Sequence, residues 1–124
     1  PYDYGMDTTL TLPVGINVGE DAPKIMASDI TGATINSTEL LKKGPIVVVF
    51  YRGEWCPVCV RYLAELNDSL SAITDLGASV IVVSPEMVEK AMQTKENTES
   101  DFVFVSDRSL EICESFNVLF ACLP

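Results

Sequence analysis

The feature that most restricts the fold of this chain is a continuous apolar run at residues 46–51, Ile-Val-Val-Val-Phe-Tyr, which is rich in β-branched side chains. A strand that is apolar on both faces belongs in the middle of a sheet that is covered on both sides. Residues 78–83 repeat this pattern, and residues 102–105 contain a third, shorter run of the same kind. The sequence therefore predicts three strands, the first of them in the interior of a sheet.

A helical pattern lies between each pair of these strands. One apolar stripe, with spacings of 4, 3, 4 and 3 residues, is formed by Cys59, Leu63, Leu66, Leu70 and Ile73. This spacing predicts a single helix, and Gly77 is in the usual position to end it. Residues 84–86, Ser-Pro-Glu, provide a cap, a proline and an acid, which together predict the start of a helix that runs to about Glu96.

Two further helices are expected to be short. The first covers residues 39–43 and is capped by Ser37 or Thr38. The last is capped by Ser106 or Asp107 and carries on one face Leu110, Cys113 and Phe116. Strands and helices thus alternate with short connections, which predicts an α/β fold with a mainly parallel sheet flanked by helices.

Length and composition limit both the domain count and the function. At 124 residues the chain is sufficient for one domain, which we place at residues 19–124 after an N-terminal arm at residues 1–18. Eight Lys and Arg against eighteen Asp and Glu give a net charge of −10, which argues against binding to nucleic acid or to an anionic membrane surface. No apolar run approaches the ~20 residues needed to span a bilayer.

The complete absence of histidine excludes Ser-His-Asp and Cys-His catalysis and any His-ligated metal centre. A nucleophile in this chain must therefore be activated by other means. The four cysteines are at positions 56, 59, 113 and 122. A chain with this much apolar material does not need disulfides for stability, so the close pair is better interpreted as a redox motif.

The setting of Cys56 and Cys59 is more informative than their spacing. The pair follows a buried strand and a tight loop, and it stands where a helix begins. Functional groups collect at the carboxyl ends of parallel strands, and the free N–H groups of a helix start stabilise a thiolate. Pro57 suits the first helical position because its missing N–H is not needed there. We expect Cys56 to cap the helix and to be the more exposed thiol, with Cys59 one turn inside.

Two non-redox interpretations of the pair remain. A zinc site would need a second pair of ligands, but Cys113 and Cys122 are nine residues apart, and Cys113 is on a core-facing helix position. The pair could also consist of two unremarkable buried thiols in a non-catalytic binding domain, which predicts that both react slowly. The redox interpretation needs neither a metal nor a cofactor.

The chain also resembles the alkyl hydroperoxide reductase/thiol-specific antioxidant (AhpC/TSA) family of peroxiredoxin-like proteins over about residues 18–120. The segments that carry the resemblance are Val-Gly-Glu-Asp-Ala-Pro at 18–23, Leu-Leu-Lys-Lys-Gly-Pro at 40–45, Phe-Tyr-Arg-Gly-Glu-Trp-Cys-Pro-Val-Cys at 50–59, Ser-Asp-Arg-Ser-Leu at 106–110 and Phe-Asn-Val at 116–118. The resemblance implies a thioredoxin-like fold and an antioxidant enzyme that reduces hydroperoxides with a cysteine thiolate.

The active loop departs from the pattern of this family. When the family's peroxidatic cysteine is placed on Cys59, Arg52 occupies the position of its proline and Cys56 the position of its threonine. The loop thus combines a peroxiredoxin frame with a thioredoxin-like Trp-Cys-Pro-x-Cys motif. Two role assignments follow. In a peroxidase, Cys59 attacks the peroxide and Cys56 resolves the sulfenic acid, whereas in a disulfide exchanger Cys56 attacks and Cys59 releases the mixed disulfide.

Several neighbours of the pair are candidates for supporting roles. Arg52 is a candidate to stabilise the thiolate, the alternative being a solvated surface side chain. Trp55 is expected to pack beside the pair and shield it, or else to be a core aromatic. Glu54 is either a proton shuttle or an exposed loop acid. Cys113 is expected to be a core thiol, with a resolving role as the alternative, and Cys122 has no assigned role.

The resemblance further implies that the substrate is a hydroperoxide or a disulfide and that a thioredoxin-like protein is the reductant. The family's active-site arginine and the last strands of a thioredoxin fold would lie beyond Pro124. We therefore expect a C-terminally truncated fold, which is completed by further residues, by a partner chain or by exchange of segments within a homodimer. A cytoplasmic location is the expectation.

Overall fold

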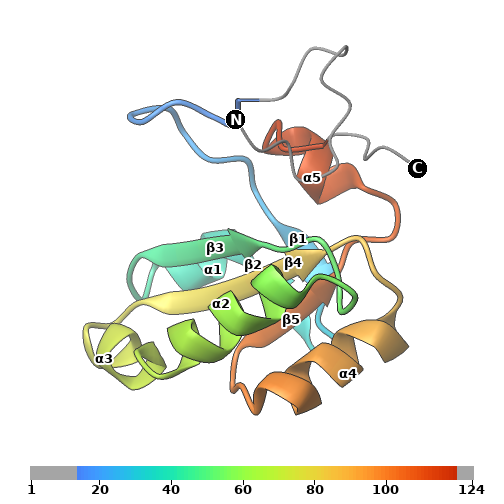
Figure 1. Ribbon diagram of the computed structural model, residues 1–124. Coiled ribbons are helices and arrows are strands. Elements are labelled where there is room, and N and C mark those ends of the chain that lie inside the picture. The colour runs from blue at the N-terminus through green and yellow to red at the C-terminus, as the bar shows by residue number, and fades with distance from the viewer. Residues whose placement is uncertain (1–13, 120–124) are drawn as a thin grey trace.

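The computed structural model describes residues 14–119, which form a mixed α/β fold (Figure 1). In chain order the elements are β1 (Met26–Ser28), β2 (Thr34–Asn36), α1 (Ser37–Leu41), β3 (Ile46–Phe50), α2 (Pro57–Asn67), α3 (Leu70–Asp75), β4 (Ser79–Ser84), α4 (Val88–Thr98), β5 (Val103–Ser106) and α5 (Glu111–Ser115). The three predicted strands are confirmed as β3, β4 and β5. Most of the predicted arm, residues 1–13, lies outside the described residues, and the division at residue 18 stays a prediction.

The main sheet of the described residues is parallel and has the strand order β3-β4-β5. Phe50 pairs with Val83, and Ser84 pairs with Ser106, so the three carboxyl ends lie together. A separate antiparallel hairpin is formed by β1 and β2. An isolated antiparallel bridge from Asp29 to Val105 joins this hairpin to β5.

The prediction that the strand at residues 46–51 is interior is wrong for the described part of the chain, where β4 is the middle strand and β3 lies at an edge. Side-chain burial follows this order. Val82 and Val83 of β4 are fully buried, whereas Val47 of β3 is 39% exposed. The two strands have nearly the same composition, and only their pairing decides which of them is central.

The sheet is covered on both faces, as its composition requires. Helices α2, α3 and α4 pack on one face, around a core that includes Leu63, Val82 and Phe104. On the other face lie α1, α5 and the β1–β2 hairpin, around Val83 and Phe116. Figure 1 shows α2 and α4 side by side, with α5 across the sheet from α4. Because side chains alternate along β4, adjacent residues supply opposite cores.

The single helix predicted over residues 59–73 is wrong in one respect, because it breaks into α2 and α3. Its apolar stripe nevertheless continues across the break and packs on one core. The break lies at Asp68 and Ser69, residue types that are favoured at helix ends and turns over helix interiors. The Asn67 side chain donates to the carbonyl of Glu99 and accepts from the N–H of Asp101, so it ties α2 to the end of α4.

Helix starts differ from their predictions by a few residues. The cap of α1 is Asn36, whose side chain accepts from the N–H of Thr38, while Ser37 Oγ accepts instead from the N–H of Ile25. Helix α4 begins at Val88 and not at the Ser84-Pro85-Glu86 signal. The predicted cap of α5, Ser106 or Asp107, is wrong in position, because Leu110 is the N-cap. The Asp107 carboxylate nevertheless accepts from the N–H groups of Ile112 and Cys113 in α5. None of the helices in the described range is long and apolar enough to cross a membrane.

Candidate active site

Cys56 and Cys59 lie at the start of α2, directly after the loop that follows β3. Cys56 is the N-cap, and its Sγ accepts from the N–H of Cys59 at 3.3 Å. Pro57 takes the first helical position. The N–H of Cys56 donates to the carbonyl of Gly53 at 3.0 Å, which closes a tight turn before the helix. The predicted placement of the pair, at a strand end and a helix start, is confirmed.

The predicted order of exposure is wrong. Cys56 is buried, with 6% of its surface exposed, whereas Cys59 is only half-buried. The sulfur of Cys56 is turned toward the first turn of α2, where it accepts from the Cys59 N–H, and the surrounding fold buries it. Cys59 is therefore the thiol that a small substrate reaches more easily.

Backbone N–H groups surround the sulfur of Cys59. The N–H of Arg52 points to Cys59 Sγ at 3.5 Å. The pKa of Cys59 is raised above its ordinary value, first by burial and then by its hydrogen bond with Cys56, while the N–H groups of Arg52 and Gly53 act to lower the pKa. The loop after β3 thus supplies the donors that favour the thiolate.

Arg52 and Trp55 contact each other at the rim of the site. The guanidinium carbon of Arg52 lies 4.8 Å from the centroid of the Trp55 ring, a cation–π arrangement. Trp55 is 58% exposed, so it is not the core aromatic that was one expectation. A methyl group at Gly53 would meet the Trp55 ring and lie 3.0 Å from Glu86 Oε1, so any larger residue here would displace these two side chains.

The acids near the loop both have partners. Glu54 is paired with Lys90 at 3.7 Å, and its side chain is 25% exposed, so the description of an exposed loop acid is wrong. Glu86 accepts from the N–H of Glu54 at 2.5 Å and from the hydroxyl of Tyr51 at 3.2 Å. From the sequence, Glu86 is expected only to be part of a helix start. Its place just after the carboxyl end of β4 is the one signal that could have identified it.

The remaining cysteines lie away from the pair or outside the described residues. Cys113 is buried in α5, where its N–H donates to Asp107 Oδ2 at 2.8 Å. Burial, together with the hydrogen bond and charge of Asp107, raises the pKa of Cys113 to about 12, as befits a core thiol. Cys122 lies outside the described residues. Within residues 14–119, no cluster of three or more His, Cys, Asp or Glu is arranged to hold a metal ion.

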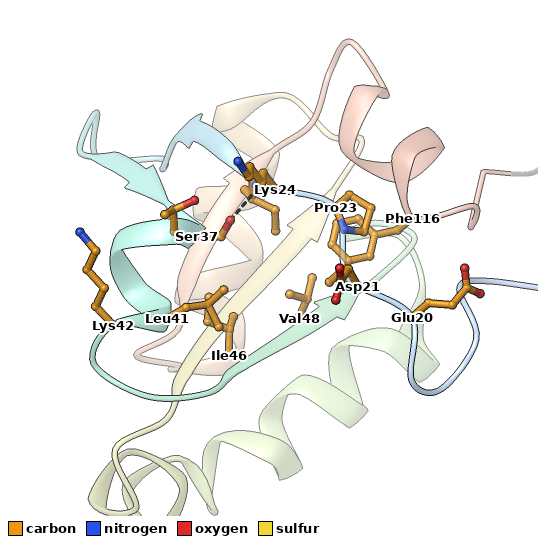
Figure 2. Close-up of a pocket in the computed structure, with 13 residues that line it drawn as sticks. Glu20, Asp21, Pro23, Lys24, Ser37, Leu41, Lys42, Ile46, Val48 and Phe116 are labelled. Carbon is orange, nitrogen blue, oxygen red and sulfur yellow. Dashed lines mark hydrogen bonds between the residues drawn. The ribbon is translucent and has the colours of Figure 1, made fainter.

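Of two hollows on the described surface, one adjoins the loop that leads to the thiols. A shallow hollow of about 530 Å³ is lined by Arg52 and Trp55 of the loop and by Met87, Lys90 and Arg108. The other, of about 700 Å³, lies between the segment at residues 20–25, α1 and β3, and Figure 2 shows its side chains. No cysteine is among the residues that line either hollow.

The sequence is similar to those of known bacterial peroxiredoxins. The chain is 27% identical to peroxiredoxin Bcp of Escherichia coli strain K12 over 103 residues, which cover 83% of this chain and 65% of that protein. It is 29% identical to peroxiredoxin Bcp of Bacillus subtilis, with the same coverage. The chain thus spans slightly less than two thirds of the length of these curated relatives.

Solved structures with similar folds include both peroxiredoxins and disulfide oxidoreductases. Peroxidoxin BcpB of Mycobacterium tuberculosis superposes with a TM-score of 0.72 at 22% identity, over 92% of this chain and 74% of that one. The thioredoxin domain of a thiol-disulfide oxidoreductase from Bacteroides vulgatus gives a TM-score of 0.71 at 22% identity, over 86% of this chain and 78% of that one. The fold is therefore thioredoxin-like, as predicted. The model of the AhpC/TSA family matches residues 18–124, and the chain belongs to that family.

Proposed function

We propose that this chain is a thiol peroxidase that reduces hydroperoxides, with Cys59 as the attacking thiol and Cys56 as the resolving thiol. The observation that carries the proposal is the unequal setting of the two sulfurs. Cys59 is the more accessible and has the Arg52 N–H directed at its sulfur, whereas Cys56 is buried within one helical turn of it. The peroxiredoxin names of the relatives support the peroxidase activity.

The proposed reaction needs only the two thiols of this chain, the hydroperoxide and one external reductant. The Cys59 thiolate attacks the terminal oxygen of a hydroperoxide, the O–O bond breaks, and the alkoxide leaves as an alcohol after taking a proton. Cys59 is then a sulfenic acid. The Cys56 sulfur attacks it, water leaves, and an intramolecular disulfide forms. A dithiol, which we propose to be a thioredoxin-like protein, supplies two electrons and two protons that restore both thiols.

The start of α2 supplies the electrostatic part of this mechanism. The N–H groups of a helix N-terminus carry partial positive charge and act to lower the pKa of a thiol beside them, against the burial that raises the pKa of Cys59. The Arg52 N–H adds a donor from the loop side. The guanidinium of Arg52 is held over Trp55, and both residues line the hollow beside the loop.

A second candidate is thiol–disulfide exchange, with Cys56 as the attacking thiol. The observation in its favour is the Trp-Cys-Pro-x-Cys order at a helix start, with Cys56 at the cap and Pro57 after it. The burial of Cys56 counts against a first attack by this sulfur. A non-catalytic binding domain, the third alternative, predicts two unreactive thiols.

The test is single-turnover loss of thiols after addition of stoichiometric hydrogen peroxide. The parent chain is compared with Cys56→Ser and Cys59→Ser, and Cys113→Ser is the control for a buried thiol. Rapid loss that survives in Cys56→Ser and disappears in Cys59→Ser is the expected result. Reaction no faster than that of a free thiol, in a chain that still reduces a model disulfide through Cys56, would replace the peroxidase with the exchanger.

A further inference from the structure

The carboxyl ends of all three parallel strands converge on one residue, Glu86, in the connection between β4 and α4. Its backbone N–H donates to Ser84 Oγ at the end of β4. Its carbonyl accepts from Ser106 Oγ at the end of β5. Its carboxylate reaches the segment that follows β3 and contacts Tyr51 and Glu54. The backbone of Glu86 is thus anchored to two strands while its side chain holds the loop after the third.

The carboxylate of Glu86 engages the loop with both oxygens. Oε1 accepts from the backbone N–H of Glu54 at 2.5 Å, and Oε2 accepts from the Tyr51 hydroxyl at 3.2 Å. A hydrogen bond to an ionised acceptor is among the stronger ones in proteins. Gly53 has no side chain, which leaves the carboxylate room to approach this part of the backbone.

This loop is also the segment that presents donors to the reactive sulfur. Arg52 and Gly53 lie between the two residues that Glu86 holds, and the Arg52 N–H is directed at Cys59 Sγ. A carbonyl of the same loop, that of Gly53, accepts from the N–H of Cys56. The position of the loop backbone relative to Cys59 therefore depends on contacts at both of its ends.

We propose that Glu86 is a positioning residue, whose carboxylate fixes the loop at residues 51–55 so that the backbone N–H groups of Arg52 and Gly53 face the sulfur of Cys59. Glu86 acts through the loop and does not touch the reacting atoms. The inference deepens the proposed function and rests on it for its biological meaning, but the contacts exist whichever substrate the thiol attacks.

A positioning role of Glu86 and a purely electrostatic role predict opposite effects on the reactivity of Cys59, so experiment can distinguish them. If Glu86 holds the loop, its loss withdraws donors from Cys59, raises the pKa of the thiol and slows its reaction at pH 7. If Glu86 acted only by its negative charge, its loss would remove a nearby anion, lower the pKa of the thiol and speed the reaction. Glu86→Gln removes the charge and keeps an acceptor of the same reach, whereas Glu86→Asp keeps the charge and shortens the reach.

The experiment measures the alkylation of Cys59 by iodoacetamide as a function of pH. It uses the full chain with Cys56, Cys113 and Cys122 replaced by serine, so that Cys59 is the one remaining thiol. Into this background are placed Glu86→Ala, Glu86→Gln, Glu86→Asp and, as a matched control, Glu89→Ala, which removes an exposed acid three residues away on α4. Circular dichroism and thermal unfolding establish that each variant is folded.

We expect Glu86→Ala and Glu86→Asp to slow alkylation at pH 7 by about fivefold, the effect of one net hydrogen bond, with the midpoint of the pH profile moved upward. Glu86→Gln and Glu89→Ala should remain within about twofold of the background. Where Glu86→Ala does not fold, the contrast between Glu86→Asp and Glu86→Gln decides the question.

Equal rates in all variants would overturn the positioning role, and so would faster alkylation in both Glu86→Ala and Glu86→Gln. Because iodoacetamide is not a peroxide, this result is independent of the proposed function. A shifted alkylation profile together with ordinary reactivity toward hydrogen peroxide would retain the positioning role and reject the peroxidase.

Discussion

At the scale of single residues, the two thiols of the site are three residues apart and differ in their hydrogen bonds and in their exposure. Cys56 caps α2 with its sulfur and is buried, while Cys59 keeps partial exposure and receives a donor from Arg52. The Trp-Cys-Pro-x-Cys pattern identifies both residues but does not assign these environments. A cap residue can point outward or fold back, and its neighbours in space decide which of these occurs.

The pH dependence of Cys59 provides a prediction at this scale. Burial and the contact with Cys56 raise its pKa, so at neutral pH most of the thiol is protonated. The rate of alkylation or of peroxide reaction should therefore still be rising at about pH 8.5, where an unperturbed thiol is half ionised. Stopped-flow measurement between pH 6 and about pH 10 checks this. A plateau already reached by pH 7 would contradict it.

At the scale of elements, caps and side-chain ties determine where helices begin and end. Asp107 is buried after β5, and its two carboxylate oxygens accept from the N–H groups of Ile112 and Cys113 in α5. Its own N–H donates to the carbonyl of Ser84 at 2.7 Å. The residue thus attaches α5 to the ends of two strands. A cap residue is visible in the sequence, whereas the link to β4 is not.

Substitution of Asp107 should therefore loosen α5. We expect Asp107→Ala to lower the free energy of unfolding by about 1–2 kcal/mol, the usual cost of a lost cap, and to raise the reactivity of Cys113. Asp107→Asn should cost less, because it keeps one acceptor oxygen. Urea unfolding and alkylation of Cys113 are the measurements, with Asp101→Ala as an exposed control. Equal stability of Asp107→Ala and Asp101→Ala would show that the cap contributes nothing.

At the scale of the whole molecule, the sheet separates two apolar cores that meet only through its strands. Val82 faces the core beneath α2 and α4, and Val83 faces the core beneath α5 and the β1–β2 hairpin. Both side chains are fully buried. The stability of the described domain therefore depends on both faces and not on one helical layer.

Truncation of either residue tests this two-sided arrangement. Val82→Ala and Val83→Ala should each lower the free energy of unfolding by about 2 kcal/mol, since each removes two buried methyl groups and leaves a small cavity. Val47→Ala on β3, where the side chain is 39% exposed, is the control and should cost much less. Chemical denaturation provides the measurement. A large loss for Val82→Ala alone would mean that the second face contributes little.

The chain sequence alone determined the element types and the location of the chemistry. Continuous apolar runs predicted the strands, because a strand in a sheet that is covered on both faces must carry apolar side chains on both sides. Helical periodicity predicted the apolar stripe that packs on one core, even though the helix breaks at Asp68 and Ser69. Cys56, Pro57 and Cys59 were correctly placed at a helix start, because caps and prolines are governed by local backbone geometry.

Only the tertiary structure decided the order of the strands, the burial of each thiol and the contacts of Glu86. β3 and β4 are equally apolar, so their order is a matter of pairing between distant segments. Cys56 is buried by its place in the assembled loop. Glu86 reaches Tyr51 and Glu54 across more than thirty positions of sequence, and no local pattern records such a contact. What depends on neighbours along the chain is visible in the sequence, and what depends on neighbours in space appears only when the chain folds.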